Sequence, residues 1–325
     1  MPLPSPLALA LTLLTLLGLA GCATLVDSRA DRRETLWMTE FPPLGRFVEV
    51  EGRRVHLLVT GRSRGSAPDV VLIHGANGNL RDFTFDLVAR LEEDFRVIAV
   101  DRPGLGYSDS WGEADSDPGL QARVLREAVA QLGVRRPIVV GHSYGGAVAL
   151  AWGLQAPTET AALVLLAGAS EPWEGDLTFW YNLNATILGG PARTLVAAFA
   201  PERAVEAALA NVFAPEAVPE GYGDHIGAGL SLRRDSQETN NRQVNNLLPY
   251  ITAMQPRYPS LRMPIELLHG DADETVPIEV HARRFLREVP SARLTEIPGA
   301  GHMLHHTHPE GAVAVIRQAR RRAGL

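Results

Sequence analysis

The sequence Gly-His-Ser-Tyr-Gly-Gly at residues 141–146 is the feature that most restricts how this chain can fold. A β-branched run precedes it at residues 137–140, and an alanine-rich stretch follows it to residue 155, which predicts a strand, a sharp turn and a helix. We expect the serine in this turn to adopt strained backbone angles, and Gly141 and Gly145 to leave room for the neighbouring elements. Ser143 would then lie exposed at the carboxyl end of its strand, as a nucleophile does. The alternative is a serine that caps a helix.

Apolar runs alternate with helical stretches over most of the chain. Strands are predicted at residues 70–73, 96–100, 137–140, 161–166, 264–268 and 292–297, and helices at residues 80–93, 120–132, 144–155, 278–288 and 309–321. Residues 47–51 and 54–60 have the pattern of two antiparallel strands at one edge. Together these segments predict an α/β fold, with a mostly parallel eight-stranded sheet and helices on both faces.

The alternation stops between residues 172 and 261, where helical segments rich in alanine, leucine and aromatic residues follow one another. We predict a helical cap over residues 172–261, inserted into a core formed by residues 46–171 and 262–325. The cap would offer the site an apolar surface, half of which we expect in the cap's own core: Trp173, Phe179, Trp180, Tyr181, Leu183, Ile187 and Leu188.

Composition and charge exclude several classes of function. The formal net charge is -6, and all 31 basic residues are arginine, because the chain has no lysine. Schiff-base chemistry on lysine, a pyridoxal phosphate anchor and a phosphate-loop lysine are therefore excluded. The acidic balance also gives no electrostatic reason to expect a nucleic-acid partner.

The amino terminus has the pattern of a secretion signal. An apolar run at residues 7–20 ends in Leu-Ala-Gly-Cys, which resembles the lipobox of bacterial lipoproteins, although no basic residue precedes it. This predicts a lipoprotein signal peptide at residues 1–21, acylation of Cys22 and a polar linker at residues 22–45. Ala23 follows the cysteine, which by analogy favours lipid anchoring in the outer membrane of a bacterial cell envelope. An ordinary signal peptide and an uncleaved membrane anchor are the alternatives.

A serine nucleophile needs a base, and the base needs an acid that orients it. Gly-Asp-Ala-Asp-Glu-Thr-Val-Pro follows one predicted strand at residues 270–277, and Gly-Ala-Gly-His follows the next at residues 299–302. Both loops lie at carboxyl ends of strands, so we expect Asp273 and His302 to meet Ser143 at one edge of the sheet. Asp271 competes with Asp273 for the role of the acid.

With these motifs the chain resembles the α/β-hydrolase fold superfamily over residues 47–325. The resemblance also covers His74-Gly75, the segment Asp-Arg-Pro-Gly-Leu-Gly-Tyr-Ser at residues 101–108 and the spacing G-x-x-D-x-x-V-P at residues 270–277. It implies the catalytic order Ser143, Asp273, His302, which favours Asp273 over Asp271. It also implies an oxyanion hole formed by the backbone N–H groups of Ala76 and Tyr144, and no cofactor.

The remaining polar residues near these motifs have structural interpretations. The resemblance implies that His74 braces its loop, whereas Asn77 and Asn79 are interpreted as turn formers and His142 as structural. His305, His306 and His308 raise the alternative of a metal site, but no zinc motif such as H-E-x-x-H accompanies them. We therefore predict no metal and interpret these histidines as a polar helix start.

The predicted activity is hydrolysis of a carboxylic ester, as by a carboxylesterase or lipase, through an acyl-enzyme on Ser143. The substrate would be a small ester with an apolar acyl or aryl group. Serine at position 143 departs from epoxide hydrolases and haloalkane dehalogenases, which resemble this chain but attack through a carboxylate. A carbon–carbon bond hydrolase, a thioesterase and a non-catalytic binding module remain alternatives.

Overall fold

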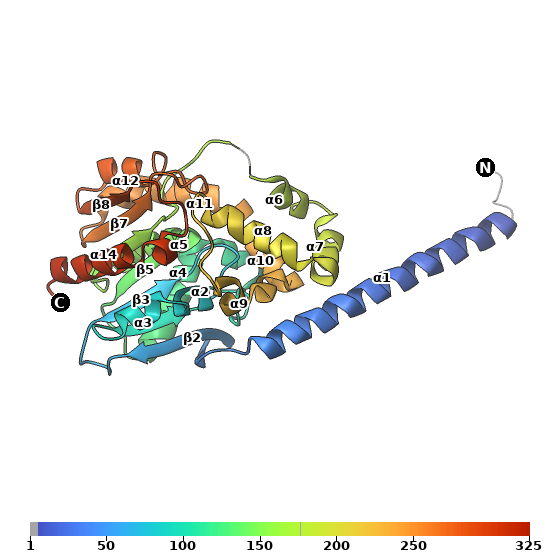
Figure 1. Ribbon diagram of the computed structural model, residues 1–325, viewed down its shortest axis with the longest axis horizontal. Coiled ribbons are helices and arrows are strands. Elements are labelled where there is room, and N and C mark those ends of the chain that lie inside the picture. Colours follow the sequence, from blue (N-terminus) through green and yellow to red (C-terminus); the bar gives the residue numbers. More distant parts are fainter. Residues whose placement is uncertain (1–5, 176) are drawn as a thin grey trace.

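The computed structural model describes residues 6–175 and 177–325, with side chains from residue 21 onward. Its centre is an eight-stranded sheet with the strand order β1-β2-β4-β3-β5-β6-β7-β8 (Figure 1). The strands are β1 (Arg46–Val50), β2 (Arg53–Gly61), β3 (Asp69–Ile73), β4 (Arg96–Val100), β5 (Ile138–His142), β6 (Ala162–Leu166), β7 (Ile265–Gly270) and β8 (Ala292–Ile297). The pairs β1–β2 and β2–β4 are antiparallel, and all other pairs are parallel. The predicted fold class is confirmed.

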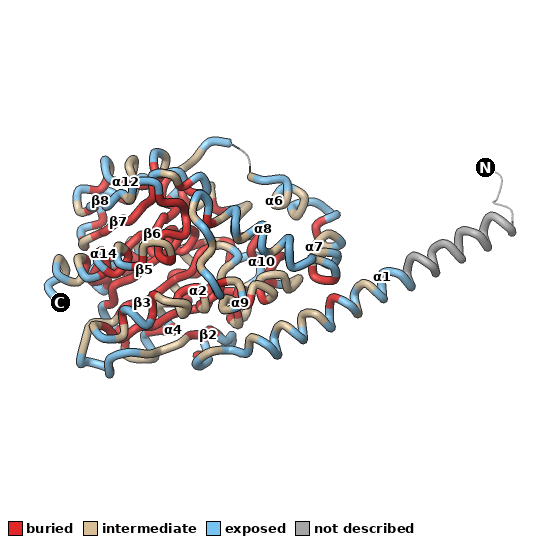
Figure 2. Tube along the Cα trace, in the orientation of Figure 1, coloured by how far each residue is buried: buried red, intermediate tan, exposed pale blue. Residues whose placement is uncertain are grey.

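Helices cover both faces of this sheet, and alternate residues of each central strand point to opposite faces. On β3, Val71 and Ile73 join one apolar cluster, whereas Val70 and Leu72 join the other. The first cluster lies under α4 (Pro118–Gln131), α5 (Tyr144–Gln155) and α12 (Ala282–Glu288). The second lies under α2 (Arg81–Thr84), α3 (Leu87–Leu91) and α14 (Pro309–Arg322). Figure 2 shows the sheet as the buried interior between these layers.

Two of the predicted core helices differ from the observed ones. The helix predicted at residues 80–93 is divided into α2 and α3, because Asp86 has a φ of -149°, outside the helical region. The helix predicted from residue 278 begins only at Ala282, after a turn at residues 278–281. The short helices η1 (Gly112–Ser116) and α13 (Leu304–Thr307) complete the core.

The chain between β6 and β7 forms helices and connecting loops, which corresponds to the predicted cap at residues 172–261. Its elements are α6 (Phe179–Asn184), α7 (Gly189–Phe199), α8 (Glu202–Phe213), α9 (Tyr222–Ile226), η2 (Ala228–Leu232), α10 (Arg234–Asn245), α11 (Leu247–Met254) and η3 (Gln255–Ser260). Side chains of α10 bind the core: the Asn240 Oδ1 atom accepts a hydrogen bond from the Asn77 N–H at 2.7 Å. The cap is therefore fixed to the loop that follows β3.

The segment at residues 22–45, which we interpreted as a polar linker, is mostly helical. It belongs to α1 (Pro6–Glu40), which packs against the cap: Ala30 is fully buried against Ala197 and Ala198. The Arg29 Nε and an Arg33 guanidinium nitrogen donate hydrogen bonds to the carbonyl oxygens of Ala198 (2.7 Å) and Ala200 (2.8 Å). These contacts with α7 stabilise a helix in a sequence whose charges indicated a solvated linker.

The predicted signal peptide lies largely outside the described residues, which exclude positions 1–5 entirely and the side chains of positions 6–20. Cys22 is exposed on α1. Among the helices that the structure describes, none combines the length and the apolar character needed to cross a membrane.

Candidate active site

Ser143 lies at the junction between β5 and α5, with φ 53° and ψ -121°. This positive φ is rare for a residue with a side chain, and it matches the strained turn expected from the sequence. The flanking glycines explain why the turn can form. A Cβ atom on Gly141 would overlap the backbone of Gly145, and a Cβ atom on Gly145 would overlap the carbonyl oxygen of Ile73. Only glycine fits at these two positions.

The structure brings His302 and Asp273 together, as the sequence predicted. The His302 Nδ1 lies 2.8 Å from the Asp273 Oδ2, and both side chains are buried. The other carboxylate oxygen of Asp273 accepts the backbone N–H groups of Thr275 and Val276, each at 2.9 Å. Burial raises the pKa of this carboxyl, but hydrogen bonds from His269 and His302 outweigh burial and hold the pKa well below its ordinary value. Asp273 is therefore ionised.

Asp271 and His142 contact the backbone near His302 rather than the nitrogen atoms of its ring. The Asp271 carboxylate accepts the backbone N–H of Gly299 at 2.6 Å, so it holds the loop that carries His302 rather than the histidine ring. The His142 Nε2 donates to the carbonyl oxygen of His302 at 3.3 Å, and its ring lies 4.9 Å from the His302 ring. Burial, with the nearby His305 and His302, holds the pKa of His142 well below its usual range. Both residues thus support the position of His302.

Ala76 and Tyr144 line the same cavity as Ser143. Tyr144 is the first residue of α5, where backbone N–H groups have no partner inside the helix. The buried Arg102 supports both positions: it donates to the Gly75 carbonyl oxygen at 2.9 Å, and its guanidinium lies 4.2 Å from the centre of the Tyr144 ring. Sequence reasoning missed this role, because Arg102 belonged to a motif interpreted only as a family signature.

The predicted loop residues are braced by hydrogen bonds. His74 accepts the Arg102 backbone N–H at its Nε2 (3.0 Å) and donates from Nδ1 to Gly75 (2.9 Å). Burial lowers the pKa of His74 to about 4, so the ring is neutral. Asn77 has a φ of 53°, and the Asn79 Oδ1 accepts the backbone N–H of Arg81. Both asparagines therefore shape the turn, as predicted.

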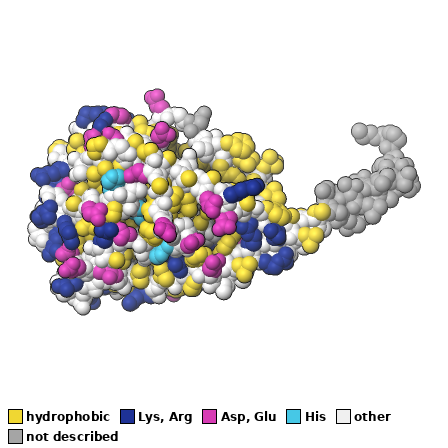
Figure 3. All heavy atoms as spheres, in the orientation of Figure 1, with side chains coloured by type: hydrophobic (Ala, Val, Ile, Leu, Met, Phe, Trp, Pro, Cys, Tyr) yellow, Lys and Arg dark blue, Asp and Glu magenta, His cyan; other side chains and the backbone are white. Residues whose placement is uncertain are grey.

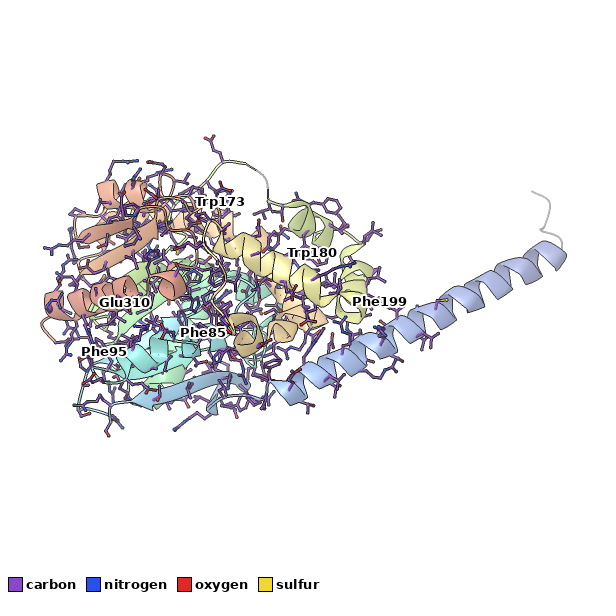
Figure 4. The ribbon with its side chains drawn as sticks, viewed as in Figure 1. Phe85, Phe95, Trp173, Trp180, Phe199 and Glu310 are labelled. Carbon is purple, nitrogen blue, oxygen red and sulfur yellow. The ribbon has the colours of Figure 1, made fainter. Side chains whose placement is uncertain are left out.

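A cavity of about 870 Å³ opens above Ser143 between the core and the cap. Of the predicted apolar cap residues, Trp173 and Tyr181 line it. Figure 4 shows Trp173 on the loop that leads from the sheet to the cap, whereas Trp180 lies on α6. Phe179, Ile187 and Leu188 are exposed to solvent, so the expectation that they close over the site is wrong.

His281 also lines this cavity, and no sequence motif indicated it. Its Nδ1 accepts two backbone N–H groups, from Ser170 at 3.2 Å and from Glu171 at 3.1 Å. Because Nδ1 is the acceptor, the ring proton lies on Nε2. Burial lowers the pKa of His281 to about 4, so the ring stays neutral. A neutral imidazole in this position can offer one N–H donor to a bound substrate.

The histidines after His302 form a buried network and not a solvated helix start. His305 and His306 each donate from Nε2 to the Asp82 carboxylate, at 3.1 and 2.8 Å, and Tyr222 donates its hydroxyl at 2.7 Å. His308 instead pairs with Glu216 at 3.2 Å. Among the described residues, Asp82, His142 and His305 could supply metal-ligand atoms within 4.8 Å of one another. The His305 Nε2 already contacts Asp82, so we interpret the group as a contact that holds α13 to α2.

Comparisons with known proteins agree with this arrangement. A family model described as the alpha/beta hydrolase fold matches residues 68–309. A 2-hydroxy-6-oxononadienedioate/2-hydroxy-6-oxononatrienedioate hydrolase from Paraburkholderia phymatum is 27% identical over 275 residues, which cover 79% of this chain and 87% of that protein.

Two solved structures have the same fold. An alpha/beta hydrolase fold protein from Burkholderia ambifaria superimposes with a TM-score of 0.70 and 23% identity, covering 84% of this chain and 96% of that one. A thermophilic esterase from Thermogutta terrifontis gives a TM-score of 0.67 and 21% identity, covering 86% and 99%. Likeness at this level of identity establishes the common fold.

Proposed function

Because the chain belongs to the alpha/beta hydrolase fold family and is a hydrolase, we propose that it cleaves carboxylic esters through an acyl-enzyme on Ser143. One observation carries the proposal. Ser143 stands on a strained turn at the wall of an 870 Å³ cavity, and a buried pair of His302 and an ionised Asp273 lies at the same edge of the sheet. This arrangement supplies a nucleophile, a base and an acid that orients the base.

The bond between Asp273 and the His302 Nδ1 determines how the histidine would act. Since Nδ1 carries the proton in that bond, the Nε2 lone pair is free to accept a proton from the Ser143 hydroxyl. The serine Oγ then attacks the ester carbonyl carbon, and the protonated His302 donates its proton to the departing alkoxide. Water, deprotonated by the same nitrogen, hydrolyses the acyl-enzyme and restores Ser143. In the described residues no hydrogen bond joins the Ser143 Oγ to His302; such bonds often close only when substrate binds.

The carbonyl oxygen becomes negatively charged during both attacks, and we propose that the N–H groups of Ala76 and Tyr144 bind it. Removal of one such donor typically costs about 10² to 10³ in kcat. Arg102 would act as a positioning residue, because its contacts reach the carbonyl next to Ala76 and the ring of Tyr144.

The charges around the cavity support an uncharged ester as substrate. Among the described residues that line it, the ionisable carboxylates are Glu174, Asp271, Asp273 and Glu274, and there is no arginine. An anionic acid would therefore meet like charge without a cation to pair with it. The apolar part of the wall, which includes Trp173, Leu247 and Val280, fits an acyl or aryl group.

The proposal is tested with the full chain and a series of 4-nitrophenyl esters of increasing acyl length. Ser143→Ala should lower the rate by at least about 10³-fold and abolish labelling by a fluorophosphonate. Asp273→Asn should lower the rate by at least about 10²-fold, because the base loses its orientation. Asp271→Asn, two residues away on the same loop, is the matched control and should cost less than about tenfold.

A loss in Asp271→Asn that equals or exceeds the loss in Asp273→Asn would contradict the assignment of Asp273 as the orienting acid. If the wild-type chain hydrolyses no ester and Ser143 is not labelled, the serine hydrolase proposal fails. A non-catalytic binding module would then be the better explanation.

A carbon–carbon bond hydrolase is the second candidate, because the relative from Paraburkholderia phymatum bears the name of such an enzyme. The substrates in that enzyme's name are dicarboxylates, and the acidic residues that line the cavity here disfavour the binding of a substrate with two carboxylates. The two activities are separated by comparing the ester series with a ring-cleavage dienol acid, whose visible absorbance disappears on cleavage. Turnover of that acid at a kcat/KM above that of every ester would favour the second candidate.

We also propose that the chain is anchored by acylation of Cys22 at a bacterial cell envelope, in the outer membrane. The supporting observations are the lipobox-like sequence at residues 19–22 and the exposure of this single cysteine. Metabolic labelling with an alkyne analogue of palmitate, followed by membrane fractionation, tests the proposal. Cys22→Ala should lose the label. A variant that keeps the label, or a wild-type chain that never acquires it, would contradict acylation at this residue.

A further inference from the structure

Large apolar side chains are exposed together on one part of the cap. Phe179, Ile187, Leu188, Leu195 and Phe199 are exposed by 78, 95, 58, 53 and 50%. We call these five residues the cap patch; they belong to α6, α7 and the turn between them. Scattered exposed apolar residues are ordinary, but a contiguous group marks an interaction surface. Figure 3 shows hydrophobic side chains gathered over this end of the molecule, next to α1.

The composition of the segment that carries the cap patch favours contact with lipid over exposure to water. Between residues 177 and 200 the only charged side chain is Arg193, and there is no acidic residue. The segment also contains Trp180, a residue type that is enriched where proteins meet the headgroup region of a bilayer. Helix α6 contains no fully buried residue, and Phe179 at its start is largely exposed.

The position of α1 indicates what covers the cap patch. The Arg29 guanidinium lies 5.0 Å from the centre of the Phe199 ring, and Ala30 packs on α7. From that contact α1 continues toward its amino terminus and leaves the body beside the cap patch (Figure 1). The sequence of this continuation is apolar over residues 7–20. Either an acylated Cys22 or an uncleaved apolar segment would therefore attach this same end of the molecule to a membrane.

We propose that the cap patch binds the surface of a lipid bilayer. Apolar side chains of the patch would enter the boundary between headgroups and acyl chains, while Arg29 of α1, which contacts Phe199, would lie at the level of anionic headgroups. Leu177, Thr178 and Tyr181, next to the patch in sequence, line the catalytic cavity. If the proposed ester hydrolysis holds, bilayer docking brings the cavity beside the membrane, where apolar esters dissolve.

Photocrosslinking of the full chain tests the docking without any measurement of hydrolysis. Ile187 is replaced by p-benzoylphenylalanine, and the protein is reconstituted in vesicles of phosphatidylethanolamine and phosphatidylglycerol. The control carries the same group in place of Leu286, which is 39% exposed on α12, outside the patch. Irradiation should give lipid adducts at position 187 at least about tenfold above those at position 286, measured by mass spectrometry. Equal yields would overturn the proposal, and adducts to protein would replace it by a protein interface.

A second measurement compares how strongly wild type and patch variants partition into vesicles. Ile187→Ser combined with Leu188→Ser should weaken the partition of the full chain into the same vesicles by at least about tenfold, because two apolar side chains no longer leave water. Leu286→Ser should leave the partition unchanged. Thermal unfolding of both variants should match wild type, since all three side chains lie at the surface. Unchanged partition of the double variant would contradict docking through the patch, whether or not the chain proves to be an esterase.

Discussion

Arg102→Leu tests whether one buried guanidinium holds the loop after β3, which carries Ala76, and the cap in place. Arg102 is completely buried and donates three hydrogen bonds to oxygen acceptors: Gln121 (3.0 Å), Gln243 (2.7 Å) and the Gly75 carbonyl (2.9 Å). Leucine removes every donor and leaves these acceptors in a buried site. A buried acceptor without a partner costs roughly 1–3 kcal/mol. Three of them give an expected loss of about 3–9 kcal/mol in the free energy of unfolding, at the lower end if water enters.

The assay is thermal unfolding followed by tryptophan fluorescence, together with ester hydrolysis. At about 2 °C per kcal/mol for a domain of this size, the midpoint should fall by roughly 6–18 °C. Arg102→Lys should recover only part of the loss, because an ammonium group cannot reach acceptors arranged for a planar fork. Among molecules that remain folded, kcat should fall by about tenfold or more, since the Gly75 carbonyl precedes the Ala76 amide.

Arg283→Gln is the control, because Arg283 forms surface ion pairs with Glu279 and Glu296 that contribute little to stability. We expect no measurable change in the midpoint for this variant. An Arg102→Leu midpoint within about 2 °C of wild type would refute the reasoning, because the three acceptors would then have found other partners. If Arg102→Lys has the wild-type midpoint, the planar guanidinium group is not required at this position.

Three further predictions concern other buried contacts. In the folded chain the pKa of His281 is lowered to about 4, whereas in the unfolded chain the same imidazole takes up a proton below about pH 6.5. The neutral His281 therefore contributes roughly 3 kcal/mol to the free energy of unfolding above pH 6.5, and this contribution is lost as the pH falls toward 4. His281→Gln, which keeps an acceptor but does not titrate, should flatten the fall of the unfolding midpoint over this range, and an unchanged slope would contradict the assignment. Gly145→Ala should lower kcat/KM for esters by at least about 10²-fold, because the new Cβ overlaps the Ile73 carbonyl. Gly153→Ala on the same helix meets only the flexible side chains of Leu163 and Leu261 and should retain activity within about threefold. Tyr222→Phe should cost about 2 kcal/mol in urea unfolding by removing a hydroxyl donor from Asp82, and a change below about 0.5 kcal/mol would show that this hydrogen bond contributes little.

The parts of the fold that depend on local sequence could be predicted. Alternating apolar runs defined the strands, and the limits of β4 and β8 agree with the prediction at both ends. The turn at Ser143 was predictable from the spacing of the two glycines around the serine. Gly141 is required by the backbone of Gly145, four residues away, whereas the contact that requires Gly145, with the Ile73 carbonyl oxygen, is distant in sequence. The meeting of His302 with Asp273 followed from two loops that end neighbouring parallel strands, β7 and β8.

Contacts between distant segments could not be predicted from one sequence. Arg102 binds Gln243, which is 141 residues away, and His281 accepts backbone groups about 110 residues away. Residues 23–40 contain no glycine and no proline, which favours a helix, but their many charges led us to interpret them as a linker. Its partner Ala197 lies in the cap, and nothing in either segment indicates the other.

The packing of α1 on the cap has a mechanical consequence. Arg29 and Arg33 hold the carbonyl groups of Ala198 and Ala200, at the carboxyl end of α7, and Arg234 of α10 pairs with Glu34. Helix and cap are thus linked at several points along their length. A movement that lifts α7 or α10 away from the sheet must either break these bonds or turn α1 with the cap. Any movement of α7 or α10 that widened the cavity would therefore also tilt α1, unless these bonds break.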